Sequence, residues 1–134
     1  MLYLVPIGRF LYSAIFLMTV LGHFSAGYIG YSAPAGVPAP GILVPLSGVI
    51  ATLGGLSITL GYKAKIGAWL IVLFLVPVTL KMHNFWAVTD PMMRGIQMAL
   101  FMKNVSMLGA ALLITHFGSG PLSLDARRAS SPLA

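Results

Sequence analysis

The sequence has no cysteine and only 2 acidic residues among its 134. The lack of cysteine excludes disulfides, thiolate metal sites and the cysteine pairs on which four-helix membrane thiol oxidases depend. Charged residues of either sign make up 7% of the chain, compared with about 25% in ordinary globular domains. Hydrophobic residues make up 58%, and the mean hydropathy is +0.95. A chain with so little polar surface cannot face water on all sides, so its composition predicts a membrane protein.

Nucleotide-binding glycine motifs and a nucleophile elbow are also missing from any context that would suit them. The net charge of +6 could indicate nucleic acid, but the basic residues are scattered singly between apolar segments, so no nucleic-acid partner is expected. The positive-inside rule explains the basic residues better, because most of them fall near the N-terminus, in the second loop and in the tail: Arg9, Lys63, Lys65, Arg127 and Arg128. Both termini are therefore predicted to be cytoplasmic.

The length suits four membrane crossings, because each crossing needs about 20 apolar residues. The predicted fold is an all-α membrane protein, a four-transmembrane-helix antiparallel bundle with helices at about 6–27, 42–60, 65–84 and 91–117. One transmembrane domain would cover residues 1–121, followed by a short cytoplasmic tail at 122–134. The first crossing is too long for a cleaved signal sequence and is expected to stay in the mature protein.

The first crossing carries one polar face. Tyr12, Phe16, Thr19 and His23 recur at helical spacing, so they share a side that should point into the bundle. The segment that follows, residues 28–41, is rich in proline, glycine and alanine and carries no charge. This composition predicts an ordered loop that lies against the membrane face with its tyrosines at the headgroups.

The second and third crossings carry signals for packing and bending. Ser47, Ala51 and Gly55 recur every four residues in the second crossing, and small residues in that register let helix backbones approach closely. In the third crossing, Pro77 removes one backbone donor and frees the carbonyl of Leu73. The sequence therefore predicts a packing seam on one helix and a kink in the next.

The fourth crossing has a clear start. Asp90 followed by Pro91 predicts a capping carboxylate and a proline at the first helical position. Arg94, one turn later, is placed to pair with Asp90. Lys103 lies nine residues beyond Arg94, or about 13 Å deeper along the helix. That depth is close to the midplane of the bilayer.

Polar residues crowd into the segment 80–104, where the third crossing ends and the fourth begins. Ionisable groups at membrane depth cost about 2.5–3.5 kcal/mol each, so a chain that keeps several is expected to use them. Together with one histidine of the first crossing they form the predicted ligand-binding site: His23, Lys81, His83, Trp86, Asp90, Arg94, Gln97, Lys103 and Asn104. No catalytic residue is assigned. No metal is predicted, because the histidines lack a carboxylate or an HExxH-like register.

Three arrangements would allow a lysine to lie near the midplane of the bilayer. Lys103 is either neutral, paired with Asp90, or neutralised by a bound anion or by polar acceptors. The cluster could accordingly be a structural polar network, a site for a quinone-like or small anionic molecule, or a path for protons. A quinone headgroup needs donors such as lysine, histidine, asparagine or tryptophan beside an apolar cleft, and the cluster would supply them.

Six short motifs, in their order and spacing, also resemble those of a known family. They are GRFLYSAIFLMTVLGHF, the GVPAP loop, LGGLSITLGYKAKIGA, HNFW at residues 83–86, FMKNVSMLGA at residues 101–110, and PLSLD. Over nearly the whole chain they resemble the DoxX family of integral membrane proteins. The resemblance implies a four-helix bundle related to membrane subunits of thiosulfate and quinone oxidoreduction and of redox-stress complexes. The chain departs from that family where His23 replaces a lysine and Ala51 a glutamate.

Two hypotheses of function follow. The first is a DoxX-like membrane subunit or anchor of a redox system in the bacterial inner membrane, an oxidoreductase subunit if it belongs to an enzyme. In this hypothesis the polar cluster binds a quinone or a small anion, and partner subunits supply the redox centres. The rival is a non-catalytic membrane protein that binds lipid or scaffolds partners. Membrane lipids are expected partners in both, quinone is the candidate cofactor of the first, and a homo-oligomer is left open.

Overall fold

The structure is a computed structural model that describes residues 1–130, and over that range it is built from helices without a strand. Four helical stretches are long and apolar enough to cross a membrane: Leu4–Phe24, Pro40–Leu60, Ala64–Ala87 and Pro91–Phe117. The predicted all-α fold with four transmembrane helices is therefore confirmed. The orientation of the termini stays a prediction, and residues 131–134 of the predicted tail lie outside the described residues.

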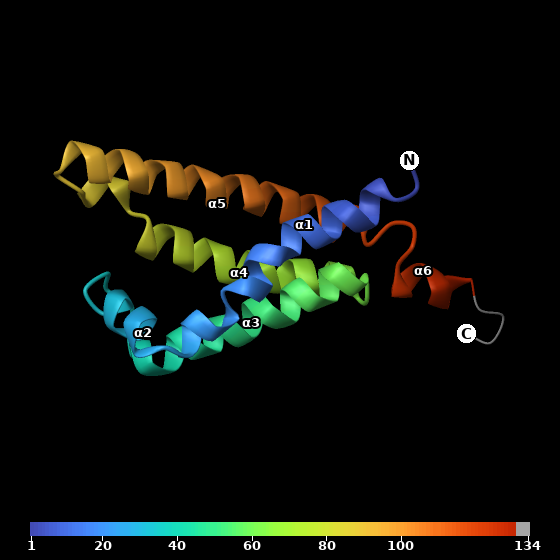
Figure 1. Ribbon diagram of the computed structural model, residues 1–134, viewed down its shortest axis with the longest axis horizontal. Coiled ribbons are helices and arrows are strands. Elements are labelled where there is room, and N and C mark those ends of the chain that lie inside the picture. Colours follow the sequence, from blue (N-terminus) through green and yellow to red (C-terminus); the bar gives the residue numbers. More distant parts are fainter. Residues whose placement is uncertain (131–134) are drawn as a thin grey trace.

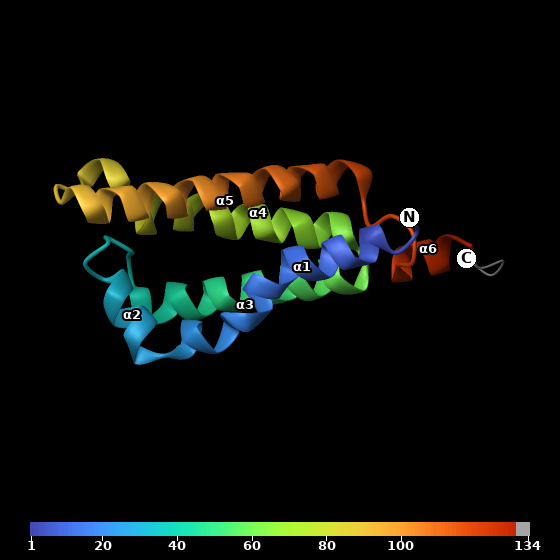
Figure 2. The same ribbon diagram turned by 45° about the horizontal axis from the view of Figure 1, so that its top comes forward.

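The helices form two diverging layers. In chain order they are α1 (Leu4–Met18), the 3-10 helix η1 (Val20–Phe24), α2 (Ala26–Ser32), α3 (Pro40–Leu60), α4 (Ala64–Met82), the 3-10 helix η2 (Phe85–Ala87), α5 (Pro91–Phe117) and α6 (Leu124–Ala129). α1 packs on α3, α3 on α4, and α4 on α5. The N-terminus and α6 lie at one end of the molecule, the α6 end, whereas α2 and η2 lie at the other, the α2 end (Figures 1 and 2).

The first crossing differs from its prediction near its end. The α-helix stops at Met18, the chain continues as η1, and Ser25 then caps α2 by accepting a hydrogen bond from the N–H of Tyr28. Serine at this position competes with helix continuation because its hydroxyl satisfies a free backbone donor. Part of the segment predicted as a loop is therefore a short helix that lies beside α3.

Small residues let α3 approach its neighbours on two sides. A Cβ added to Gly54 would lie 2.9 Å from the carbonyl oxygen of Gly67 in α4. A Cβ added to Gly55 would lie 3.3 Å from the Cβ of Phe16 in α1. Ala51, on the same helix, is fully buried in the core. The predicted packing seam is confirmed at Ala51 and Gly55, and together with Gly54, which was not part of the prediction, these residues make α3 the centre of the bundle.

The chain beyond α5 folds back onto the α6 end of the bundle. Arg9 of α1 is buried, and its guanidinium donates hydrogen bonds to the carbonyls of Ser119 and Leu122. Asp125 of α6 accepts hydrogen bonds from the backbone N–H groups of the first residues of α4. We call these contacts of Arg9 and Asp125 the clamp. They tie α1, the α3–α4 turn and the tail together, and no pattern in the tail predicted this docking.

The clamp should respond to acid through Asp125. Burial opposes ionisation of this carboxyl, but hydrogen bonds from the N–H groups of Lys63 and Ala64 outweigh it, so the pKa of Asp125 is held below its ordinary value. A carboxyl whose pKa is lowered by folding adds stability above its unfolded pKa and loses it as the pH falls through the folded pKa. The contribution of Asp125 should therefore be lost below the ordinary carboxyl pKa of about 3.9.

We expect an Asp125→Asn variant to unfold at a lower temperature than the parent at neutral pH. The difference in unfolding temperature should shrink as the pH falls below the ordinary carboxyl pKa of about 3.9, because the unfolded parent then binds a proton that the folded parent does not. Thermal unfolding in detergent, measured for both proteins across this pH range, checks the expectation. A difference that does not change with pH would show that the charge of Asp125 does not hold the clamp.

Candidate functional site

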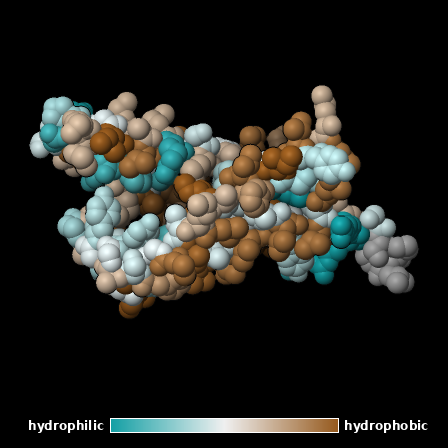
Figure 3. Space-filling model, viewed as in Figure 1, coloured by the Kyte–Doolittle hydropathy of each residue, from teal (hydrophilic) through white to brown (hydrophobic). Residues whose placement is uncertain are grey.

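A cleft of about 830 Å³ lies between the two layers at the α2 end. One wall is formed by the end of α1, η1, α2 and the start of α3, and the other by the end of α4 and the middle of α5. Figures 1 and 2 show α4 and α5 diverging from α2 and α3 towards this end. Hydrophilic residues gather along this part of α5, while hydrophobic residues dominate the middle of the molecule (Figure 3). The volume is within the range of about 300–1,000 Å³ typical of ligand pockets.

The structure separates the predicted site residues into two groups. Five of the nine line the cleft, from η1, the end of α4 and the middle of α5: His23, Lys81, His83, Lys103 and Asn104. The other four are outside the residues that line it: Trp86, Asp90, Arg94 and Gln97. The cleft is therefore lined by the polar residues at the end of α4 and in the middle of α5. The polar residues in the first two turns of α5 are not part of its lining.

His23 is held in place by its neighbours. It is 8% exposed, and its Nδ1 lies 2.9 Å from the carbonyl oxygen of Thr19. Because a carbonyl only accepts, Nδ1 must carry the hydrogen, which leaves Nε2 as the free ring nitrogen. The rings of Tyr28 and Phe74 contact the imidazole edge to face at centroid distances of 5.6 and 5.8 Å. The histidine is therefore oriented by packing before any ligand arrives.

His83 joins the ends of two helices. Its Nδ1 lies 2.9 Å from Oε1 of Gln97, a bond that connects the C-cap of α4 to α5. Since Oε1 of an amide only accepts, Nδ1 of His83 carries the hydrogen here as well. Gln97 thus has a positioning role beside the cleft. Residues 1–130 contain no group of three or more histidine, aspartate or glutamate side chains that could hold a metal ion.

Lys103 and Asn104 sit side by side in α5 but in different surroundings. Asn104 is 4% exposed, and within residues 1–130 the structure gives its amide side chain no hydrogen bond. Lys103 is exposed towards the cleft that both residues line. Lys103 is twelve residues into a helix of 27, so its Cα lies about 18 Å along the axis, near the middle of the helix. The amide of Asn104 and the amine of Lys103 are therefore neighbours on the α5 wall of the cleft.

Asp90 and Trp86, which lie outside the cleft, make contacts that stabilise the fold. Asp90 caps α5 by accepting a hydrogen bond of 2.8 Å from the N–H of Met93, which confirms the predicted cap. The predicted pairing of Asp90 with Arg94 is wrong, because within residues 1–130 no ion pair within 4.0 Å joins them. Trp86 is 55% exposed and packs edge to face on two phenylalanines of η2 and α5. Such an aromatic group is typical of a membrane interface.

Several lining residues were not predicted as part of a site. Tyr28, Tyr31 and Ser32 reach the cleft because their segment forms α2 and not a surface loop. Leu73 and Pro77 also line it. The proline was recognised as the residue that frees the carbonyl of Leu73, and a free acceptor in an apolar helix was a signal that could have marked this wall.

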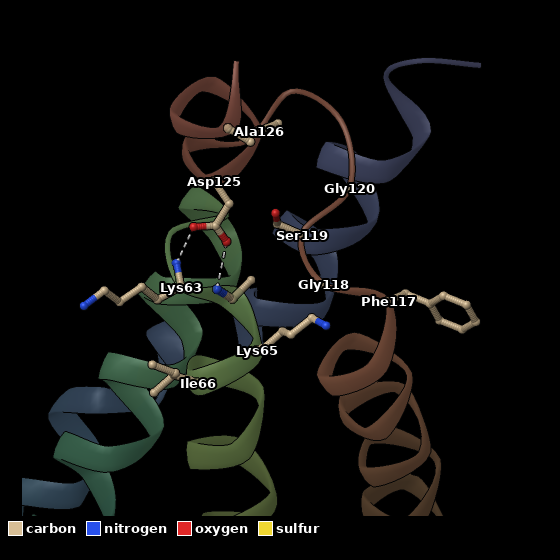
Figure 4. Close-up of a pocket in the computed structure, with 11 residues that line it drawn as sticks. Lys63, Lys65, Ile66, Phe117, Gly118, Ser119, Gly120, Asp125 and Ala126 are labelled. Atoms are coloured by element: carbon tan, nitrogen blue, oxygen red, sulfur yellow. Dashed lines mark hydrogen bonds between the residues drawn. The ribbon is translucent and has the colours of Figure 1, made fainter. Parts of the chain in front are cut away.

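A second pocket of about 510 Å³ lies at the α6 end, between the start of α4 and the chain after α5. In Figure 4 the side chain of Lys65 extends towards the segment at Gly118, that of Lys63 points away, and the Asp125 carboxylate faces the backbone of α4. The carboxylate already supplies the negative charge that a helix N-terminus attracts. We therefore assign this pocket to the clamp.

Comparison with known proteins identifies relatives in membranes. The sequence model of the SURF4 family matches residues 42–130. The ER-derived vesicles protein ERV29 of Saccharomyces cerevisiae is 31% identical over 68 residues, which are 51% of this chain and only 22% of the yeast protein. The inner membrane protein YphA of Escherichia coli is 32% identical over 101 residues, which are 75% of this chain and 71% of YphA. No solved structure matches the chain.

These matches correct the predicted resemblance. The expected membership of the DoxX family is wrong, and so is the predicted role as a redox subunit with a quinone-like or small anionic ligand and redox partner subunits. The reason lies in what the motifs encode. LGGLSITLGYKAKIGA contains Gly54 and Gly67, which let α3 and α4 pack closely, and PLSLD contains Asp125 of the clamp. Glycines at a helix contact and a capping carboxylate suit any tight helical bundle, so they do not distinguish membrane families.

Proposed function

The chain belongs to the SURF4 family of multi-pass membrane proteins, and we propose that it is a non-enzymatic binding protein that takes an amphiphilic lipid from the bilayer into the cleft at its α2 end. The observation that carries this proposal is the cleft itself, which combines a volume of about 830 Å³ with walls that are mostly apolar. A few oriented polar groups in an apolar pocket are what a ligand with both a polar and an apolar part requires.

The dimensions of the cleft favour a lipid over a helix of another protein. On α4 the lining runs from Leu73 to His83, or about 15 Å along the axis. That is half of the hydrocarbon core, whose thickness is about 30 Å. The cleft thus has the depth of one leaflet, whereas a transmembrane helix of a partner would need a groove across both.

The walls also leave a way in from the side. Leu46 of α3 and Leu73 of α4 both line the cleft and are 48% and 58% exposed. Side chains that are exposed within a membrane-spanning bundle contact lipid, because no water is present in the hydrocarbon core. A lipid chain can therefore enter laterally between α3 and α4 without crossing a polar layer.

The polar groups of the cleft suit binding better than bond-breaking chemistry. The chain has two acidic side chains, and both bind backbone N–H groups at helix starts, Asp90 at α5 and Asp125 at α4. Neither carboxylate is free to act as a general base in the cleft. The name of YphA supports a bacterial inner membrane as the location, which we include in the proposal.

Filling the cleft should abolish lipid retention. We expect Val78→Trp, on the α4 wall, to reduce the phospholipid that stays bound after purification in detergent, because the indole occupies the space of a lipid chain. Ile50→Trp, on the α3 wall, should do the same. Native mass spectrometry of the purified proteins counts the retained lipids.

The matched control is Val49→Trp, because Val49 is 42% exposed on α3 and outside the residues that line the cleft. This variant should retain as much lipid as the parent. Circular dichroism confirms that all three variants are folded. Equal lipid retention in Val78→Trp and Val49→Trp would contradict a lipid site in the cleft.

A further inference from the structure

Lys103 places a positive charge where the chain itself offers no negative one. Its Cα lies near the middle of the membrane-spanning helix α5, and its side chain is exposed to the cleft. A charged side chain at this depth costs about 2.5–3.5 kcal/mol unless it is paired or solvated. Because long side chains on a helix point back towards its N-terminus, the ammonium group is directed towards the mouth of the cleft, where Lys81 lies.

Both acidic side chains are too far away to pair with Lys103. Asp90 precedes it by thirteen residues, or about 20 Å along the same helix, and its carboxylate binds the N–H of Met93. Asp125 lies at the opposite end of α4, where it binds the first backbone N–H groups of that helix. Any negatively charged partner for the ammonium group must therefore come from outside the described chain.

The neighbours of Lys103 in the cleft are also donors. Lys81 is exposed at the mouth, and the amide of Asn104 is 4% exposed without a hydrogen bond within the described residues. The two amines and the NH2 group of Asn104 can all donate to one anionic oxygen, and none of the residues that line the cleft carries a negative charge.

From this arrangement we propose that the lipid bound in the cleft is an acidic one, and that its anionic headgroup lies below the membrane surface between Lys81 and Lys103, with Asn104 as a further donor. This inference rests on the proposed lipid site and adds the chemistry that selects the ligand. The lipid chains leave the cleft sideways, between α3 and α4. Two kinds of acidic lipid would fit, because a phospholipid and a fatty acid both carry an anionic oxygen on an apolar molecule, the first in its phosphate and the second in its carboxylate.

The test uses the full chain reconstituted in nanodiscs of equal parts phosphatidylglycerol and phosphatidylcholine, followed by native mass spectrometry of the lipids that remain bound. The parent should retain phosphatidylglycerol in preference to phosphatidylcholine. Lys103→Met, which keeps the length of the side chain and removes the charge, should reduce that preference about tenfold, as expected for the loss of one charge-assisted hydrogen bond. The amount of phosphatidylcholine retained should not fall.

Two further variants separate this inference from the proposal on which it rests. Lys65→Met removes the same charge outside the cleft and should leave the preference unchanged. Val78→Trp should remove both lipids, and its failure to do so overturns the lipid site itself. An unchanged preference in Lys103→Met overturns only the acidic headgroup. A second arm adds oleate: its retention in place of phosphatidylglycerol supports the inference and identifies a carboxylate as the anionic group.

Discussion

An Arg9→Met variant is expected to lose about 3–6 kcal/mol of unfolding free energy, because it removes two hydrogen bonds from a charged group, which contribute about 1.5–3 kcal/mol each. The guanidinium donates to the carbonyls of Ser119 and Leu122, and methionine leaves both without a donor. α6 and its linker should then detach from α1. Unfolding in detergent by titration with dodecyl sulfate, followed by circular dichroism, measures the loss.

Two controls show whether the arginine acts through its geometry. Arg9→Lys keeps the charge but lacks the planar fork that reaches two carbonyls at once, so its stability should fall between those of the parent and Arg9→Met. Arg94→Met removes an exposed arginine outside the clamp and should change stability by less than about 0.5 kcal/mol. An Arg9→Met protein as stable as Arg94→Met would refute the clamp as a source of stability.

Gly54→Ala is expected to cost about 1–3 kcal/mol of unfolding free energy, the usual cost of overpacking a close contact. The added Cβ would lie 2.9 Å from the carbonyl oxygen of Gly67, and backbone on the facing helix cannot rotate away as a side chain can. α3 and α4 must therefore separate. The same titration measures the loss, and Gly54→Leu should increase it.

The matched control is Gly95→Ala, since a Cβ at Gly95 in α5 would meet nothing within 4 Å. This substitution should be neutral or stabilising by up to about 1 kcal/mol, because alanine is the better helix former. Equal stability changes at Gly54 and Gly95 would mean that the contact between α3 and α4 does not depend on the missing side chain.

Local signals predicted the parts of the fold that depend on neighbours in sequence. The start of α5 was predicted from Asp90 and Pro91, and the cap at Asp90 is confirmed. The seam on α3 was predicted from the spacing of small residues, and the contact of Gly55 with α1 confirms it there. Capping and small-residue packing are decided within one or two helical turns, so they can be read from a single sequence.

The features that were missed depend on long-range contacts. The bonds of Arg9 reach 110 and 113 residues along the chain, and no local pattern encodes such partners. The cleft could be predicted only in part: the polar residues His83 and Lys103 were found, but the wall formed by α2 was not, because Ser25 was not recognised as a helix cap. The family was mistaken because packing motifs are shared among unrelated bundles.

The clamp also sets the order in which the bundle can be completed during synthesis. Arg9 is made 110 residues before its acceptor at Ser119, a delay of roughly 6–22 s at about 5–20 residues per second. Until then its guanidinium must remain at the membrane surface, where water or headgroups solvate it. α3 and α4 are joined by a short turn and can pair much sooner. Helix α1 should therefore reach its final position after α3 and α4 have paired, once the ribosome has delivered Ser119.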